Sequence, residues 1–510
     1  MSGPSVVSRP PGRMSTVETT AGAAPRLDAR SERIVVGSLS AIALVLGLIS
    51  LGRPEFFPDE SYTWSTVNRS IPAMVSILVH KEAFQVLHSV LLWPVNAMSQ
   101  SSFALRFPSV LFFAATVPAV WALARRLFDQ RAALVAALLL TINAFALQYA
   151  QEARSYTLAM MFAAYAGAAL ARDVMDPTRW SRRAWMVCAI AAVWAHGMAV
   201  FAITAMIASL LVLPRERLVG RRFLRDAIIV GVLVAPVIIA PELQLNRAEA
   251  FPSGDHPSLA TLRLVTWAMA GRSAFALVPY ALGGLVAVLA ALRAARTKGR
   301  SVDTWRFAMP LLWLLFPPAF LISYSFVSQV WVERYAIPSL GALVVLVAYG
   351  LTRINTTRAL AAVLAVSIAA GGYGVVRWYM HPGLSSFNDV LSAIEARGAS
   401  GDAVALATDR SRVPLEFALR QSSLRRQLVP VFPPEPWGKF HTGMQEGIAL
   451  PAATVGELRA KYDRVWVIAG FYDPDPQIAH SLRLLRDAGY RLDFSHTYGG
   501  PIALYLFQRR

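Results

Sequence analysis

The chain has 510 residues, of which 55% are hydrophobic and only 16% charged, and its formal net charge is +18. Its repeated apolar runs are long enough to cross about 30 Å of hydrocarbon, which excludes a soluble globular protein. The excess Lys and Arg residues fall in the short connections between these runs, so they indicate membrane topology and not a nucleic-acid-binding surface. The single cysteine, Cys188, excludes an intramolecular disulfide.

Residues 1–32 are rich in Ser, Pro, Gly, Ala and Arg, and we expect them to form a disordered cytoplasmic tail. They lack the basic, apolar and small-residue order of a cleaved signal, so the first apolar run is expected to remain as an anchor. Eleven apolar runs predict membrane spans at residues 34–51, 107–124, 132–147, 156–171, 184–200, 201–213, 227–241, 275–292, 307–324, 337–351 and 360–376. The short run 201–213 is alternatively a re-entrant segment.

Alternate connections between these runs are rich in arginine, and the positive-inside rule places them in the cytoplasm together with the N-terminal tail. The other connections are therefore expected on the outer face. A transmembrane domain is predicted over residues 33–378. Its first outer loop, residues 53–106, is apolar but interrupted by Pro72 and Pro94, which favours interfacial helices.

Composition shifts sharply after Tyr379, and residues 379–510 are predicted to form an extracytoplasmic α/β domain. The segments "GDAVALAT" and "DRVWVIAG" indicate buried strands, "SSFNDVLSAIEARG" and "QIAHSLRLLRDAGY" indicate amphipathic helices, and "RLDFSHTYGGPIALYLFQR" indicates a hairpin. The expected fold class is a polytopic α-helical membrane protein with about 11 transmembrane helices and this additional C-terminal domain.

An acidic pair, Asp59 and Glu60, lies in "FFPDESYTW" just beyond the first predicted span. A carboxylate flanked by aromatic rings at a membrane surface is partly desolvated, which suits a general base that takes a proton from a sugar hydroxyl. The alternative is structural, because acidic residues also cap the first turn of a helix, here one beginning near Ser61.

Two more outer segments carry charged and aromatic residues at the edge of a span. The segment "QYAQEARSY" contains Glu152 and Arg154, and "WVERYA" contains Glu333 and Arg334. A guanidinium group binds phosphate oxygens in a bidentate manner, so both arginines are candidates for a lipid phosphate. The alternative is that Arg154 extends to ordinary lipid or pairs with Glu152.

The ordered series "FFPDESYTW", "ALRFPSVLF", "LQYAQEARSYTLAM", "WAHGMAVF" and "ERYAIPSL" resembles the GT-C membrane glycosyltransferases over about residues 34–350. The closest branch is the family 39 or ArnT-like group, including the mannosyltransferase-like members of actinobacteria. The resemblance implies a helical bundle with an outer cavity for a polyprenyl-phosphate sugar, and it implies Asp59 as the base. It also implies donor-handling roles for Tyr149, Gln151, Glu152, Arg154, Arg334 and Tyr335.

The chain departs from this family at one place. Many relatives carry a second acid before a His and Tyr-Tyr stretch, whereas this chain keeps His80 and His88 but has Ile77 at the acidic position. A role in placing a metal or the acceptor is then vacant. His80 and Glu82 are a weak candidate metal pair, since metal sites need three or four ligands. The cofactor is therefore left undetermined, with a divalent cation as one option.

The resulting hypothesis is an inverting glycosyltransferase of the cell membrane that moves a sugar from a polyprenyl-phosphate donor to a cell-envelope glycan, lipid or protein. Asp59 is the expected base, and Glu60 is expected to orient the acceptor or to bind a cation. The expected substrate pocket comprises Tyr149, Gln151, Glu152, His80, His88, His196 and Arg106. Alternatives are a transporter of lipid-linked sugars, or a homologue that binds such lipids without turnover. In the C-terminal domain, Trp437, Phe440 and His441 are expected to bind a glycan acceptor or to pack.

Overall fold

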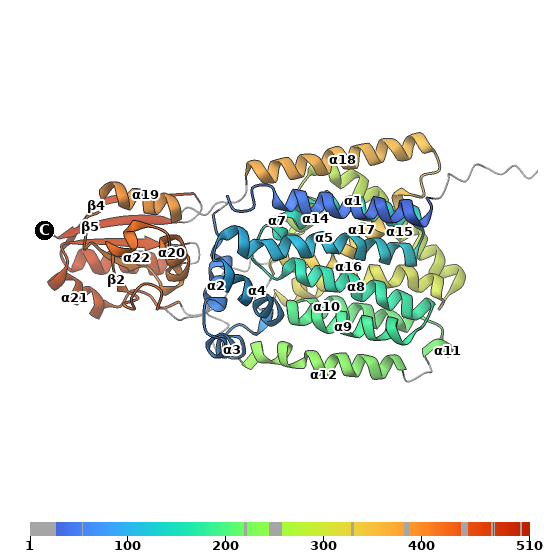
Figure 1. Cartoon of the computed structure of the whole chain (residues 1–510), viewed down its shortest axis with the longest axis horizontal. Coiled ribbons are helices and arrows are strands. Elements are labelled where there is room, and N and C mark those ends of the chain that lie inside the picture. Colours follow the sequence, from blue (N-terminus) through green and yellow to red (C-terminus); the bar gives the residue numbers. More distant parts are fainter. Residues whose placement is uncertain are drawn as a thin grey trace, which may run out of the picture.

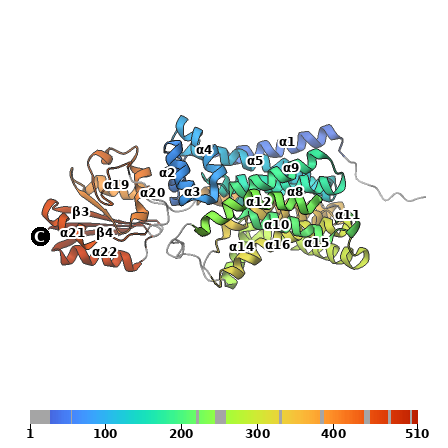
Figure 2. The same cartoon turned by 90° about the horizontal axis from the view of Figure 1, so that it is seen from below.

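The computed structural model describes residues 27–53, 55–218, 222–243, 258–327, 331–381, 387–439, 447–470, 473, 475–499 and 502–509. The chain forms a helical bundle and a smaller α/β domain that lie end to end (Figures 1 and 2). The predicted fold class is confirmed. Most of the N-terminal tail, for which the sequence predicted disorder, lies outside the described residues. Helix α1 begins at Ala29, four residues before the domain boundary predicted at residue 33.

The bundle is built from long apolar helices that run side by side and from short helical segments that connect them (Figure 1). They are α1 (Ala29–Leu48), α5 (Ser102–Leu127), α6 (Gln130–Thr141), α7 (Ala144–Ala150), α8 (Tyr156–Met175), α9 (Arg179–Ala195), α10 (Ala199–Ser209), η2 (Leu210–Val212), α11 (Arg215–Leu218), α12 (Arg222–Leu243), α14 (Leu259–Met269), η3 (Ala274–Ala276), α15 (Leu277–Lys298), α16 (Val302–Tyr324), η4 (Glu333–Ser339), α17 (Leu340–Leu351) and α18 (Thr357–Met380).

Within the described residues, eight helices are long and apolar enough to cross a membrane, or up to ten if each of two bent helix pairs counts as one span. The predicted number was eleven. Part of the difference lies in the predicted spans at 184–200 and 201–213, since the chain breaks at His196 into α9 and the short α10. The span predicted at 132–147 is bent by 56° between α6 and α7.

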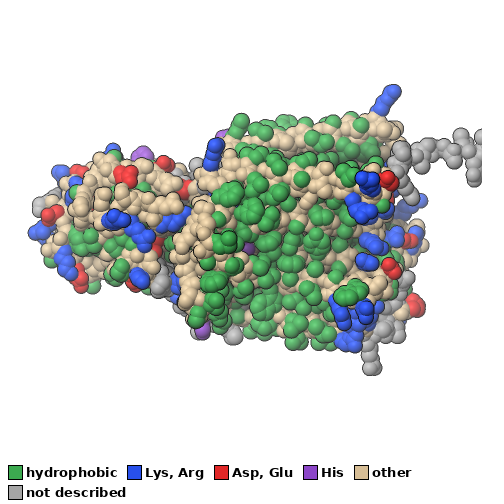
Figure 3. Space-filling view, in the orientation of Figure 1, with side chains coloured by type: hydrophobic (Ala, Val, Ile, Leu, Met, Phe, Trp, Pro, Cys, Tyr) green, Lys and Arg blue, Asp and Glu red, His purple; other side chains and the backbone are tan. Residues whose placement is uncertain are grey.

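The surface of the bundle has the polarity of a membrane protein. Hydrophobic side chains cover its middle, and Lys and Arg side chains gather at the end opposite the α/β domain (Figure 3). Ion pairs tie the connections at this arginine-rich end together: Arg222 lies 2.8 Å from Asp173, and Arg182 pairs with the buried Asp226. The chain is therefore a multi-pass membrane protein.

Residues 53–106, which the sequence predicted as the first outer loop, contain α2 (Pro58–Val67), α3 (Ile71–His80), η1 (Ala83–Gln85) and α4 (Val86–Met98). These helices lie between the bundle and the α/β domain (Figure 1). The axes of α3 and of the η1–α4 segment differ by 109°, so the apolar stretch does not form one straight span. Helices are thus present where the sequence predicted them.

The α/β domain contains one mixed sheet with strand order β2-β1-β3-β5-β4. Its elements are α19 (Phe387–Arg397), β1 (Ala403–Leu406), η5 (Asp409–Ser411), α20 (Arg412–Leu419), η6 (Ser423–Arg426), β2 (Val429–Phe432), α21 (Ala452–Lys461), β3 (Arg464–Ala469), α22 (Asp475–Asp487), β4 (Tyr490–Thr497) and β5 (Ala503–Arg509). Strands β1, β2 and β3 pair in parallel, while β5 pairs antiparallel with β3 and β4. The predicted strands, helices and hairpin are confirmed.

The α/β domain contacts α2 directly. Phe417 of α20 stacks on Phe56 with ring centroids 4.0 Å apart, and the Tyr62 hydroxyl donates a hydrogen bond to the Arg410 carbonyl. The Glu55 carboxylate accepts a hydrogen bond from the Asn388 amide (2.8 Å). Helix α2 is therefore held between the two parts of the molecule.

Trp437, which the sequence predicted either to bind a glycan or to pack, makes packing contacts in the structure. Its indole donates to the Leu428 carbonyl (2.9 Å), and the Arg412 guanidinium lies 4.2 Å from the ring centroid. Both contacts lie within the α/β domain, which agrees with the packing alternative. Phe440 and His441 lie outside the described residues.

Candidate active site

Helix α2 carries the predicted base at its first turn. Pro58 starts the helix, where a missing amide hydrogen costs nothing, and the Glu60 carboxylate accepts from the Phe57 amide (2.8 Å). Asp59 and Thr63 are four residues apart and so share one face of the helix. Glu60 therefore caps the first turn of α2, which was the structural alternative for the acidic pair. Asp59 lies on a different face of the helix.

Glu60 forms a buried ion pair with Arg106 of α5. The guanidinium donates from Nε to Oε1 and from Nη2 to Oε2 of Glu60, both at 2.7 Å, and the two side chains are 2% and 1% exposed. Glu60 Oε1 also accepts from the Ala153 amide (2.7 Å). Arg106 reaches the carbonyl of Leu51 (3.0 Å). This pair fixes α2 against α5 and the connection before α8.

Two arginines converge on Asp59. Arg334 Nη2 lies 3.2 Å from Asp59 Oδ2, and Arg154 Nη1 donates to the Asp59 carbonyl (3.1 Å) and to the Thr63 hydroxyl (3.0 Å). The Asp59 side chain is 3% exposed and the Arg334 side chain 20% exposed, so the ion pair is largely shielded from solvent. Three segments far apart in the sequence thus meet at one place.

The position of Arg334 follows from packing beneath it. It lies in η4, and the indole of the fully buried Trp313 donates to the Pro338 carbonyl of this segment (2.9 Å), while the Ser339 hydroxyl donates to the Trp313 carbonyl (3.0 Å). These hydrogen bonds anchor the end of η4 on α16 and so orient Arg334.

A second ion pair lies next to Arg334. Arg272 Nη2 is 2.6 Å from Glu333 Oε1, and its guanidinium lies 5.4 Å from the Phe145 ring and 5.3 Å from the Trp267 ring. Arg272 was not predicted as a site residue. The available signal was an arginine in the otherwise apolar "WAMAGRSAFAL" at an outer connection.

Aromatic side chains form a wall beside the arginines. The His196 ring lies 5.1 Å from Tyr156 and 5.7 Å from Tyr335, and Tyr149 packs edge-on against Tyr156 at 5.1 Å. His196 Nδ1 accepts from the Met198 amide (3.2 Å), which orients its ring. The structure therefore brings Tyr149, His196 and Tyr335 together with the charged residues.

Glu152 adds another carboxyl group to the residues around Asp59 and Arg334. Burial raises its pKa from 4.5 to about 8, with the nearby Glu60 charge adding to the shift and Arg334 opposing it. Gln148 Nε2 donates to Glu152 Oε1 (3.4 Å). At neutral pH Glu152 is largely protonated, so it can donate a hydrogen bond to an anion.

This raised pKa makes stability depend on pH. The folded protein retains a proton that the unfolded chain releases above about pH 4.5, so the Glu152 contribution falls from about pH 4.5 to about pH 8. The Glu152→Gln side chain is neutral at every pH. We therefore expect the melting temperature of this variant, measured in detergent, to fall less between pH 4.5 and pH 8 than that of the parent protein. The control is Glu457→Gln, whose side chain is 76% exposed. Parallel pH curves for Glu152→Gln and the parent protein would contradict the assignment.

Three predicted site residues have other surroundings. Gln151 donates to the carbonyls of Gly47 (3.0 Å) and Ile49 (2.8 Å) and accepts from Trp378 (2.6 Å), so it joins α1 and α18. His80 is exposed and hydrogen-bonds the carbonyl of its own helix at Ser76 (2.8 Å), away from the cluster. His88 is buried, and within the described chain its ring nitrogens have no hydrogen-bond partner.

Glu82 lies closer to the cluster than the sequence suggested. Its Oε2 accepts from the Thr66 hydroxyl (3.1 Å), seven residues along α2 from Asp59, and its charge interacts with those of Arg154 and Arg69. The Glu82 amide donates to the carbonyl of Ile77 (2.9 Å), the residue that the sequence placed at the position of the missing acid. With His80 pointing away, the two residues do not form the considered metal pair. The part of the chain that the structure describes holds no group of three or more His, Cys, Asp or Glu side chains suited to a metal.

The comparisons with known proteins concern the family pattern and the fold. The family model described as dolichyl-phosphate-mannose-protein mannosyltransferase matches residues 86–244, a segment that includes Glu152, Arg154 and His196. The match does not reach Asp59 or Arg334. No curated protein matches the chain.

Solved structures extend the likeness to most of the chain. ArnT from Cupriavidus metallidurans bound to undecaprenyl phosphate matches over 94% of this chain and 98% of its own, with a TM-score of 0.58 and 15% identity. The Archaeoglobus fulgidus oligosaccharyltransferase with Zn and sulfate matches over 91% and 73%, with a TM-score of 0.52 and 14% identity. The same organism's AglB, with an inhibitory peptide and a dolichol-phosphate, has a TM-score of 0.54 and 11% identity over the same shares.

The sequence resemblance to ArnT-like proteins is thus confirmed at the level of fold. The match covers both the helical bundle and the C-terminal domain of this chain, in the same order. The chain is a multi-pass membrane protein with the GT-C glycosyltransferase fold.

Proposed function

We propose that the protein is an inverting glycosyltransferase that moves a sugar from a polyprenyl-phosphate donor to a cell-envelope acceptor. The observation that carries this proposal is the convergence of Arg334 and Arg154 on Asp59, with Arg334 3.2 Å from its carboxylate. The donor class is supported by the description of the matching family and by the undecaprenyl phosphate and dolichol-phosphate in the related structures. The narrower likeness to actinobacterial mannosyltransferases stays a prediction.

The proposed chemistry needs one base and charge neutralisation. The Asp59 carboxylate takes the proton of an acceptor hydroxyl, whose oxygen attacks the anomeric carbon. The bond between that carbon and the donor phosphate oxygen breaks, and its electron pair remains on the phosphate. A phosphate whose second pKa is about 6 leaves without a general acid. The guanidinium groups of Arg154 and Arg334 stabilise the charge that grows on it.

The contact between Arg334 and Asp59 implies an order of binding. Arg334 pairs with a carboxylate that is only 3% exposed, so this contact has to open before an acceptor hydroxyl reaches the carboxylate. A donor phosphate competes with Asp59 for the same guanidinium group and thereby releases the base. We therefore expect the donor to bind before the acceptor.

The remaining residues have supporting roles in this proposal. Glu60 and Arg106 position α2, and Gln151 positions the connection that carries Glu152 and Arg154. The aromatic wall around His196 contacts the sugar or the first units of the polyprenyl chain. Protonated Glu152 donates a hydrogen bond to the phosphate and so avoids repulsion.

The distribution of charge supports the proposed orientation in the membrane. The arginine-rich end of the bundle (Figure 3) is assigned to the cytoplasm by the positive-inside rule, which puts Asp59 and the α/β domain on the outer face of the cell membrane. A glycan, lipid or protein acceptor then approaches from outside.

An assay in detergent tests the function. Purified protein is offered a set of polyprenyl-phosphate sugars with envelope extracts as acceptors, and we expect sugar transfer with release of polyprenyl phosphate. A transporter has no activity without a membrane, and a non-catalytic homologue binds the donor unchanged, so either outcome contradicts the proposal. Mass spectrometry of envelope glycans from a deletion strain identifies the sugar and the acceptor that are lost.

The Arg334→Gln variant is expected to bind the donor at least about tenfold more weakly, because a hydrogen bond to a charged group contributes about 1.5–3 kcal/mol. Donor affinity is measured by titration of the detergent-solubilised protein. The matched control is Arg263→Gln, an exposed position on α14. Unchanged affinity in Arg334→Gln would rule out its phosphate contact.

A further inference from the structure

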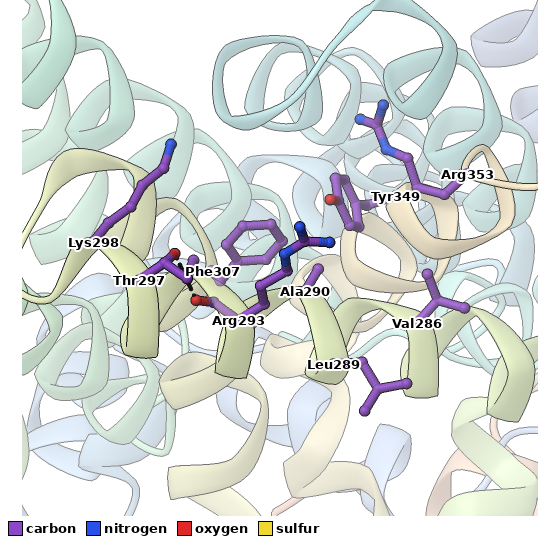
Figure 4. Close-up of a pocket in the computed structure, with 10 residues that line it drawn as sticks. Val286, Leu289, Ala290, Arg293, Thr297, Lys298, Phe307, Tyr349 and Arg353 are labelled. Atoms are coloured by element: carbon purple, nitrogen blue, oxygen red, sulfur yellow. Dashed lines mark hydrogen bonds between the residues drawn. The ribbon is translucent and has the colours of Figure 1, made fainter.

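A groove with a cavity volume of about 450 Å³ lies between α15, α16 and α17. Its lining combines apolar, aromatic and cationic side chains, as the close-up in Figure 4 shows, including Leu289, Ala290, Arg293, Phe307, Tyr349 and Arg353. Nothing in the proposed glycosyl transfer uses these residues.

The groove lies at the far end of the bundle from Asp59. Arg353 Nη2 is 2.6 Å from Asp129 Oδ2, and Asp129 lies in the short connection between α5 and α6. Helix α5 begins near Arg106, the partner of Glu60, and its 26 residues span about 39 Å at 1.5 Å per residue. The groove therefore belongs to the arginine-rich end.

Helix packing explains why a groove forms here. Helices α15 and α17 approach closely at Gly283 and Gly350, where an added Cβ on Gly350 would collide with the Gly283 carbonyl. Helix α17 ends at Leu351, whereas α15 continues to Lys298, so its last turns extend beyond its neighbour. The Phe307 and Tyr349 rings, with centroids 5.0 Å apart, line the space that remains.

The cations in the groove differ in how they are neutralised. Lys298 pairs with Asp303 (2.6 Å), and Arg353 pairs with Asp129 while lying 4.5 Å over the Tyr349 ring. Among the described residues, no carboxylate lies within ion-pair distance of Arg293. Its side chain extends from α15 toward Tyr349 (Figure 4). The Arg293 guanidinium group can therefore neutralise a bound anion without first giving up an ion pair to a described carboxylate.

The apolar side of the groove continues into the surface that faces hydrocarbon. Leu289 is 56% exposed, and its neighbours Leu285 and Leu292 on α15 are 57% and 48% exposed. A free inorganic anion would gain nothing from these side chains, whereas an acyl chain would cover them. Basic pockets between transmembrane helices characteristically accept anionic lipid head groups.

We propose that this groove binds an anionic phospholipid, with its phosphate on Arg293 and Arg353 and an acyl chain along Val286 and Leu289. The basic residues in the last turn of α15, Arg296 and Lys298, also complement the helix dipole. Arg293 lies more than one turn before the helix end and lines the groove, so its charge serves the ligand.

Native mass spectrometry of the full chain in detergent tests this site. The protein is offered phosphatidylglycerol and phosphatidylcholine in equal amounts, and we expect it to retain phosphatidylglycerol. Arg293→Gln is expected to weaken this binding about fivefold, the effect of one basic side chain at a membrane surface. Arg296→Gln is the matched control, because it removes the same charge from the same helix end outside the groove. Ala290→Trp fills the groove and is expected to prevent retention.

Several outcomes would overturn the assignment. Equal retention of both lipids excludes recognition of the anionic head group, and equal weakening by Arg293→Gln and Arg296→Gln points to general surface charge. Displacement of the lipid by an equal concentration of inorganic phosphate assigns the site to free phosphate instead. Melting temperatures in phosphatidylcholine establish that each variant is folded, so lost binding is not lost structure.

Discussion

Replacing Asp59 with asparagine is expected to lower sugar transfer by about 10²- to 10⁴-fold, the usual contribution of a general base. The amide keeps the size of the side chain and can still contact Arg334, but it cannot accept the proton of an acceptor hydroxyl. Donor binding should change far less than turnover, because Arg154 and Arg334 remain. The measurement is the initial rate of transfer at saturating donor.

The Asp463→Asn variant provides the matched control. It makes the same chemical change on a side chain that is 84% exposed in the α/β domain. We expect it to transfer sugar at the parental rate. If Asp59→Asn also retains most of its activity while its melting temperature is unchanged, Asp59 is not the base.

The Arg106→Leu variant is expected to lose about 3–5 kcal/mol of stability, because it leaves the Glu60 carboxylate buried without its partner. Arg106 makes two 2.7 Å hydrogen bonds to Glu60 and also reaches the Leu51 and Glu55 carbonyls. Denaturant unfolding in detergent measures the loss. Transfer should fall as well, since α2 loses its anchor on α5.

A double-mutant cycle separates the ion pair from simple packing. The Glu60→Leu and Arg106→Leu double variant removes both charges, and we expect it to be more stable than Arg106→Leu alone. If the single variant loses less than about 1 kcal/mol, the pair behaves like an exposed salt bridge and does not fix α2.

The fold was largely accessible from the sequence because its main signals are local. Apolar runs identify most of the long helices, and alternation with a Gly-Gly turn identifies the β4–β5 hairpin. The boundaries of elements were less accessible: the sequence placed the break between two predicted spans at residues 200 and 201, whereas α9 ends at Ala195 and α10 begins at Ala199.

The charged partners in the site were less accessible, because they depend on long-range contacts. Placing the outer segments on one face of the membrane was enough to group Asp59, Arg154 and Arg334. No local pattern indicates that Glu60 pairs with a residue 46 positions away, or that Gln151 joins helices α1 and α18. Such partners are found only when the helices are packed.

The β2 strand and helices α20 and α21 were also not predicted. Strand β2 has four residues, including Pro430, and forms only parallel pairing at the sheet edge. Helix α20 lies in a segment with mixed charges, and its apolar residues contact α2 as well as the domain core. Its role at this contact could not be read without the three-dimensional structure.

The most direct test of the central claim is a structure with a non-hydrolysable polyprenyl-phosphate sugar bound. We expect the phosphate oxygens to contact the guanidinium groups of Arg154 and Arg334, and the Asp59 carboxylate, separated from Arg334, to face the anomeric carbon with room for one hydroxyl between them. A phosphate bound elsewhere, with the contact between Asp59 and Arg334 intact, would contradict it.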